Sequence, residues 1–192
     1  GSGSSSTGNA YSFGTGTNTD RAMGSVGSGN AAAGDFATGV LLRNTSGTTI
    51  TDIKVTYTGE QWRRDNASAQ VVSFYYKTSS SAISALQPNA NGTWTAVSAL
   101  NCSSPQNSAT AGALDGNSAA NRTTFTQISI PSLSLANNDY IMLKWDDPNH
   151  TGNDHGLSID DVTIEWTVIT GTHTSVQFAS TGSTVNENVG TV

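Results

Sequence analysis

The chain has 192 residues, a net charge of -6 and a sequence pI of about 4.7. Only 11% of its residues are charged and 35% are hydrophobic, and Ser, Thr, Asn and Gly supply much of the remainder. This acidic balance argues against a nucleic-acid partner, and no apolar run approaches the roughly 20 residues that span a bilayer. Ser and Thr favour strands and turns, whereas Asn and Gly favour turns, so we expect an all-β protein that is secreted or displayed on a cell surface.

Apolar and polar residues alternate wherever hydrophobic residues cluster, which indicates β-strands, and no window shows useful helical periodicity. We expect strands at residues 36–43, 50–58, 70–77, 94–100, 123–130, 140–145 and 157–168. Strands of this number, separated by Gly, Asn and Ser turns, predict a jelly-roll β-sandwich of antiparallel strands over residues 10–168. The Gly-rich residues 10–35 and the polar residues 101–122 are expected to be long connections at the rim.

The two ends of the chain differ in character from this predicted domain. Residues 1–9 begin GSGSSSTG and suggest a linker or the remnant of a tag. Residues 169–175 are polar and predict a linker, and residues 176–192 predict the start of a second module, because so short a segment cannot bury a core alone. The single cysteine, Cys102, excludes an intrachain disulfide and is expected to be a small buried apolar group.

Residues 145–162 (WDDPNHTGNDHGLSIDDV) concentrate acidic and amide side chains between two predicted strands. Calcium takes about six to eight oxygen ligands, so this stretch predicts a Ca²⁺ site. Its candidate ligands are Asp146, Asp147, Asn149, Asn153, Asp154, Asp160 and Asp161. Neighbouring strand residues point to opposite faces, so only one of the last two can face a given site. The alternative is a solvated turn, and zinc held by His150 and His155 is a poorer match.

The stretch GEQWRR (residues 59–64) follows a predicted strand. A tryptophan can stack on a sugar ring while charged and amide groups bind its hydroxyls. The predicted ligand-binding residues are therefore Glu60, Gln61, Trp62 and Arg63. Alternatively, Trp62 closes one end of the core and Arg63 pairs with a loop carboxylate.

A second polar stretch, LDGNSAANR (residues 114–122), could either complete a cation shell or fix its own loop by Asx turns, and we favour the second. Glu60 and the aspartates of residues 146–161 could in principle form a hydrolase pair, but sequence does not show the distance between them. The chain has no GxSxG, HExxH or phosphate-loop motif, which favours a protein without catalytic activity.

Several stretches together resemble a jelly-roll domain of large secreted bacterial proteins, where it often lies beside nuclease, phosphatase or adhesin modules. They are YSFGTGTNTDRAMGSVGSG (11–29), YTGEQWR (57–63), LDGNSAANR (114–122) and DHGLSIDDV (154–162). The segment LSIDDV also looks like the last strand of MAM-type and lectin-like jelly rolls. The tail VQFASTGSTVNENVGTV (176–192) resembles the first strand of a Calx-β repeat, with Glu187 in its ENVGTV signature. This resemblance implies a long multidomain surface or secreted protein.

These observations predict a non-catalytic, calcium-stabilised binding module that recognises a carbohydrate or another cell-surface ligand. The alternative is a structural or adhesive spacer that joins neighbouring domains of the same protein. In that case the C-terminal strand could also pair with the sheet edge of another copy and cause self-association.

Overall fold

The structure is a computed structural model that describes residues 1–30, 33–168, 173–178 and 185–187, the last two ranges by their backbone. The long strands are β3 (Phe36–Arg43), β4 (Asp52–Arg64), β5 (Val71–Ser79), β9 (Arg122–Ser129), β10 (Tyr140–Asp147) and β11 (Gly156–Thr167). The shorter ones are β1 (Asn9–Phe13), β2 (Ala22–Val26), β6 (Thr95–Ala96), β7 (Cys102–Ser103), β8 (Gly112–Ala113), β12 (His173–Phe178) and β13 (Val185–Glu187). Two single-turn 3₁₀ helices occupy Ser98–Leu100 and Ala119–Asn121.

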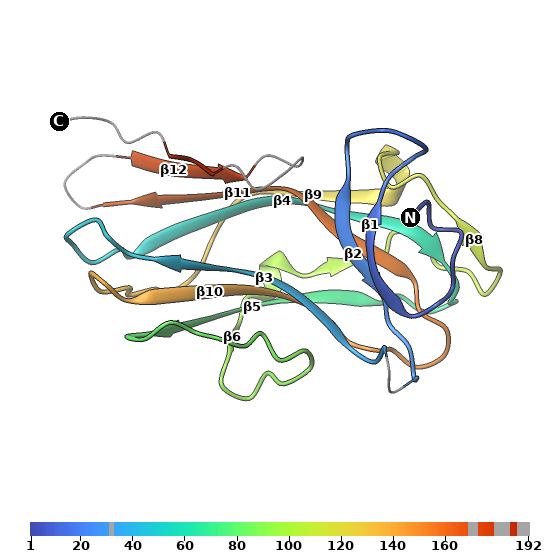
Figure 1. The fold of residues 1–192 in the computed structure, drawn as a ribbon, viewed down its shortest axis with the longest axis horizontal. Coiled ribbons are helices and arrows are strands. Elements are labelled where there is room, and N and C mark those ends of the chain that lie inside the picture. Colours follow the sequence, from blue (N-terminus) through green and yellow to red (C-terminus); the bar gives the residue numbers. More distant parts are fainter. Residues whose placement is uncertain (31–32, 169–172, 179–184, 188–192) are drawn as a thin grey trace.

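The strands form two antiparallel sheets that face each other, which confirms the predicted all-β jelly-roll sandwich (Figure 1). In the larger, eight-stranded sheet the order is β1-β2-β11-β12-β13, and β4 pairs with the opposite edge of β11 and carries β8 and β9. The smaller, five-stranded sheet has the order β3-β10-β5-β6, with β7 on β5. Every pairing among the described strands is antiparallel.

The main core lies between the sheets and is rich in aromatic side chains. Trp145 of β10 makes edge contacts with Tyr57 of β4 and Phe74 of β5, at centroid distances of 5.5 and 5.0 Å. Tyr57 also stacks on Phe125 at 4.6 Å. Such ring pairs stabilise a core beyond the area that they bury. Cys102 is buried in the same cluster, as predicted, and burial raises the pKa of its thiol to about 12.

A second apolar cluster lies away from the main core and consists of Phe13, Ala22, Val26 and Trp62, with Tyr11 packed against it. Strand alternation places these side chains on the outer face of the larger sheet. The turn that contains Gly116 covers this cluster, because a Cβ atom on that glycine would lie 2.4 Å from the Trp62 ring. One end of the larger sheet is therefore buried on both faces.

The outer face of the smaller sheet is covered by the connection between β5 and β6, residues 80–94. Leu86 of this connection lies against Gly39 of β3, where a Cβ atom would approach its methyl carbon to 2.4 Å. The same connection carries Asn89 and Asn91 to the side chain of Asp146 on β10. It is thus held down along its length, although its sequence contains no strand signal.

The sequence predicted β3 with its observed bounds, and it predicted four of the other five long strands to within two residues of their observed ends. The exception is β4, which continues through Arg64 and so contains all of GEQWRR rather than ending before it. Residues 94–100 were expected to be one strand but form two strand residues followed by a 3₁₀ turn. Residues 10–35 were expected to be a rim connection but contain β1 and β2.

Residues near both ends of the chain contact the domain. The carbonyl groups of Gly3 and Ser4, within the predicted linker or tag, each accept a hydrogen bond from Arg63. Near the C-terminus, β12 pairs with residues Thr163–Thr167 of β11, and β13 pairs with β12. The remainder of the predicted linker and Calx-β-like tail lies outside the described residues. No described helix is long and apolar enough to cross a membrane.

Candidate functional site

The four predicted ligand-binding residues lie inside the protein rather than on its surface. Their relative exposures are 3% for Glu60, 0% for Gln61, 1% for Trp62 and 7% for Arg63. The Trp62 ring is parallel to that of Phe13 at a centroid distance of 6.0 Å, and its Nε1 donates a hydrogen bond of 2.8 Å to Glu60 Oε2. The sequence-based alternative placed Trp62 at one end of the core; the structure buries it instead in the second apolar cluster, apart from the main core.

Glu60 is a buried carboxyl group without an ion-pair partner among the described side chains. Burial raises its pKa to about 7, the hydrogen bond from Trp62 opposes this shift, and the nearby charge of Asp160 adds to it. A carboxyl group with such a pKa could in principle exchange protons near neutral pH. In this position, however, it lies beneath the turn that contains Gly116 and serves as an acceptor for the indole.

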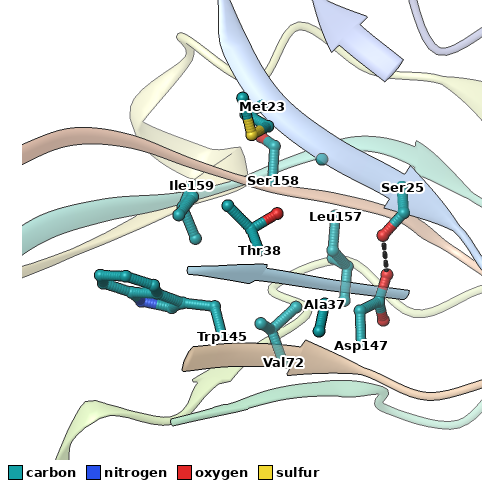
Figure 2. Close-up of a pocket in the computed structure, with 11 residues that line it drawn as sticks. Met23, Ser25, Ala37, Thr38, Val72, Trp145, Asp147, Leu157, Ser158 and Ile159 are labelled. Carbon is teal, nitrogen blue, oxygen red and sulfur yellow. Dashed lines mark hydrogen bonds between the residues drawn. The ribbon is translucent and has the colours of Figure 1, made fainter. Parts of the chain in front are cut away.

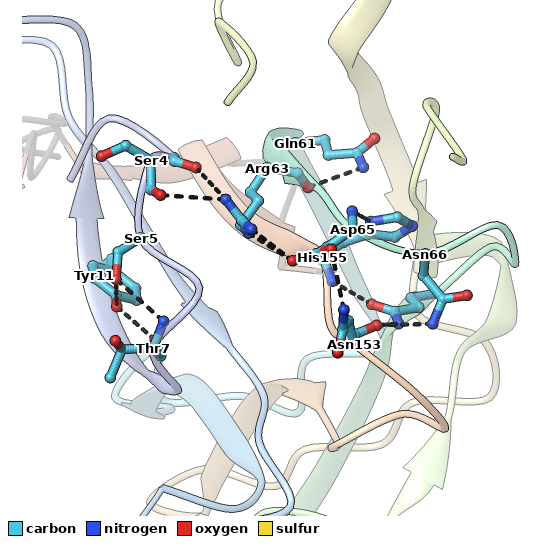
Figure 3. A network of polar contacts seen from close by, with 12 residues as sticks. Ser4, Ser5, Thr7, Tyr11, Gln61, Arg63, Asp65, Asn66, Asn153 and His155 are labelled. Carbon is cyan, nitrogen blue, oxygen red and sulfur yellow. Dashed lines mark hydrogen bonds and ion pairs between the residues drawn. The ribbon is translucent and has the colours of Figure 1, made fainter. Parts of the chain in front are cut away.

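Arg63 pairs with a loop carboxylate, as the same alternative predicted. Its Nε and Nη2 donate to Asp65 Oδ2 at 3.1 and 2.6 Å, and both side chains are buried. Its Nη1 donates to the carbonyl groups of Gly3 and Ser4 (Figure 3). Asp65 Oδ1 also accepts a 3.2 Å hydrogen bond from Asn153. The ion pair therefore joins β4, the N-terminal segment and the acidic loop.

The acidic loop between β10 and β11 is fixed by donors from residues 65–71. The side chains of Asn66 and Gln70 both donate to the carbonyl of Asn153, each at 2.8 Å. His155 accepts a hydrogen bond from the Asp65 amide at Nδ1, and its Nε2 lies 3.3 Å from the Ser68 carbonyl. Both ring nitrogens of His155 are thus occupied (Figure 3), which leaves neither for a zinc ion.

The seven predicted calcium ligands fall into separate environments. Asp146 and Asp147 are neighbours on β10 and point to opposite faces of the smaller sheet. Asp146 accepts from Asn89 N and Asn91 Nδ2 at 2.9 Å each, and Asp147 accepts from Ser25 at 2.5 Å between the sheets. These two residues therefore cannot share one ion.

The remaining predicted ligands lie in the loop and on β11. Asp154 accepts a 2.9 Å hydrogen bond from the His150 amide, and Asp160 accepts one from the amide of Asp161 at 2.8 Å. Asp161 is exposed and has a positive φ of 52°, at a point where the register between β11 and β4 shifts. Asn149 and Asn153 are also exposed, and each donates a hydrogen bond to an aspartate, Asp35 and Asp65 respectively.

These contacts test how well the loop fits a calcium ion. The buried carboxylates already accept hydrogen bonds from the protein, which is an alternative means of stabilising buried negative charge. Within the described part of the chain, no three His, Cys, Asp or Glu side chains form a group that could hold a metal ion. Asp146 and Asp147 cannot share one ion, and calcium binding by the other predicted ligands stays a prediction.

A small cleft of about 20 Å³, room for about one water molecule, lies between β2 and β3 at the edge of the sandwich (Figure 2). Its polar lining comes from Ser25, Thr38, Asp147 and Ser158, and Trp145 and the exposed Met23 contribute apolar surface. Burial raises the pKa of Asp147 to about 7, against the opposing effect of the hydrogen bond from Ser25. Sequence reasoning placed Asp147 in a loop site and did not connect it to β2.

Sequence reasoning also missed a buried lysine, Lys144 of β10, which has a relative exposure of 0%. Its Nζ lies 2.6 Å from Asn91 Oδ1, 3.2 Å from the Gln87 carbonyl and 3.7 Å from Asp146 Oδ1. The rings of Trp94 and Tyr75 flank the amine at 4.5 and 5.3 Å. One signal was available, because a lysine in a strand that is apolar on both faces (YIMLKW) has no obvious route to solvent.

Comparison of the chain with protein-family models, with curated protein sequences and with solved structures gave no match. The resemblances drawn from its short motifs therefore stay predictions.

Proposed function

We propose that this chain is a non-catalytic structural and adhesive module of a larger extracellular protein. One observation carries the proposal: the polar side chains that could bind or transform a ligand are buried and bonded to the fold itself. Glu60 binds Trp62, Arg63 binds Asp65, and His155 holds the loop after β4. A buried ion pair is often kept because it specifies one arrangement of the chain, which suits a rigid module.

For adhesion, we propose a carbohydrate or another cell-surface ligand at the cleft between β2 and β3. The support is the surface around the cleft, where the hydroxyl groups of Ser25 and Thr38 lie beside the exposed Met23, because a few such polar groups beside apolar surface can orient a bound sugar. A glycan array probed with the labelled chain tests this idea. We expect binding to be lost in Thr38→Trp, which fills the cleft, and kept in Thr123→Trp on the distant strand β9.

Two results would contradict the proposal. Glycan binding that survives Thr38→Trp would place the ligand elsewhere, and hydrolysis of a glycan that is abolished by Glu60→Gln would show an enzyme. The Thr123→Trp variant controls for the added surface tryptophan, because Thr123 is exposed and lies on β9, which does not line the cleft.

The spacer role requires that the module not polymerise through its own edges. β12 covers the edge of β11 at Thr163–Thr167 within the same chain. We therefore expect the full chain to be monomeric in size-exclusion chromatography, whereas a chain that ends at residue 168 exposes this edge and associates. Identical monomers in both cases would show that the exposed edge of β11 does not drive association.

A further inference from the structure

The side chains of Lys144, Asn91 and Asp146 contact one another in a single cluster. The lysine amine contacts the side-chain oxygen of Asn91 at 2.6 Å, while the nitrogen of the same amide donates to Asp146 Oδ2 at 2.9 Å. Asp146 Oδ1 in turn lies 3.7 Å from the lysine amine. A nucleophile, an amide and a carboxylate that touches both are thus held together.

The lysine and the aspartate of this cluster are buried, and Asn91 is half-buried. Lys144 has a relative exposure of 0% and Asp146 of 1%, and the rings of Trp94 and Tyr75 flank the amine. A desolvated lysine next to a proton acceptor is an activated nucleophile.

We propose that Lys144 and Asn91 form an intramolecular amide cross-link with the help of Asp146. The Nζ–Cγ bond forms and the Cγ–Nδ2 bond of Asn91 breaks. One of the three protons of the lysine ammonium stays on the new amide, and Asp146 passes the other two to the departing nitrogen, which leaves as ammonium. The reaction needs no oxidant or further reactant, and proximity replaces an external catalyst.

The cross-link joins β10 to the connection between β5 and β6, and it closes a long loop of the chain. With Cys102 as the single cysteine, no disulfide can do this within the chain. A covalent bond of this kind suits a rigid extracellular module, but the inference rests on the geometry alone and stands whether or not the proposed function is correct.

Intact-mass spectrometry of the purified full chain tests the proposal. We expect a mass below that of the sequence by about 17 Da, the ammonia released when a lysine amine displaces an amide nitrogen. The variants Lys144→Met, Asn91→Ala and Asp146→Asn should each show their full sequence mass. Lys77→Met is the matched control, because Lys77 hydrogen-bonds Thr93 of the same connection without contacting Asn91, and it should keep the loss.

A tryptic digest excludes the main alternative, cyclisation of Asn91 onto the backbone of Gly92, which also releases ammonia. The cross-link blocks cleavage after Lys144 and joins residues 78–122 to residues 123–192. Full mass in the folded wild-type chain would overturn the proposal. So would a loss that persists in Lys144→Met, or a wild-type digest in which trypsin cleaves after Lys144.

Discussion

Two buried cations, Arg63 and Lys144, fasten loops to this sandwich by different chemistry. The guanidinium of Arg63 donates two hydrogen bonds to one oxygen of Asp65, the shorter at 2.6 Å. The amine of Lys144 lies 3.7 Å from Asp146 and makes its shortest contact, 2.6 Å, with an amide oxygen. A guanidinium keeps its charge in a protein and needs its counterion, whereas an amine can lose a proton and react. The first region is thus built for a permanent ion pair, and the second allows a covalent bond.

The largest effect that would sharpen this contrast is expected from Asp65→Ala. This change leaves the charge of Arg63 buried without its partner, so we expect the free energy of unfolding to fall by about 3–5 kcal/mol. Urea denaturation measures it. The double variant Arg63→Met/Asp65→Leu should recover most of the loss, because it removes both charges together. An equal loss in the single and double variants would contradict a charge-based explanation.

A smaller effect is expected for Glu60, a buried acid without an ion-pair partner among the described side chains. Its pKa is raised from 4.5 to about 7 in the folded chain, so the folded state holds its proton more tightly than the unfolded state. Stability from this group is therefore fully present below pH 4.5 and is lost as pH rises through 7, by at most about 3 kcal/mol.

Thermal unfolding measured between pH 4 and 8 should therefore show a fall in Tm with rising pH that is shallower in Glu60→Gln. Asp147 and Asp160, whose pKa values are also raised, contribute the slope that remains in this variant. Identical pH dependence in the wild type and Glu60→Gln would show that the carboxyl does not titrate as described.

Arg63→Lys is expected to cost about 1–2 kcal/mol, because a lysine keeps the charge but lacks the guanidinium fork. The hydrogen bonds to Gly3 and Ser4 should then weaken together with the ion pair. Urea denaturation gives the stability, and proteolysis of the N-terminal segment gives an independent measurement. If Arg63→Lys is as stable as the wild type, the guanidinium geometry of Arg63 does not stabilise this region, and the contrast with Lys144 fails.

The smallest effect is expected from a chelator. Because donors from the protein already serve the carboxylates of the acidic loop, EDTA should leave the Tm unchanged, and added Ca²⁺ should not raise it. Calcium-dependent stabilisation that disappears in Asp154→Asn would instead show that this loop binds the ion, as predicted from the sequence.

The alternation of apolar and polar residues predicted most of the strands. It failed where a strand is buried on both faces, because such a strand does not alternate. GEQWRR contains three charged residues in six positions, and nothing in its local sequence indicates that Glu60 and Arg63 will be buried. β1 and β2 escaped detection because they are short and rich in small and polar residues.

The same reasoning explains the outcome at the predicted site. The stretch from Asp146 to Asp161 contains many oxygen atoms, which sequence shows directly. Their partners Ser25, Asn89 and Asn91 lie more than fifty residues away, and only the pairing of strands brings them close. The opposite orientation of Asp146 and Asp147 could have been deduced from strand alternation alone, had β10 been extended by two residues.

β11 changes neighbours along its length, and this has a consequence for how the domain opens. Its first half bonds β2 and β4, and its second half bonds β4 and β12. Opening this strand would release three others at once, so the N-terminal hairpin and the C-terminal strand should unfold together with it. We expect the slowest amide hydrogen exchange of the larger sheet along Leu157–Ile164, and a single cooperative transition when those amides finally exchange.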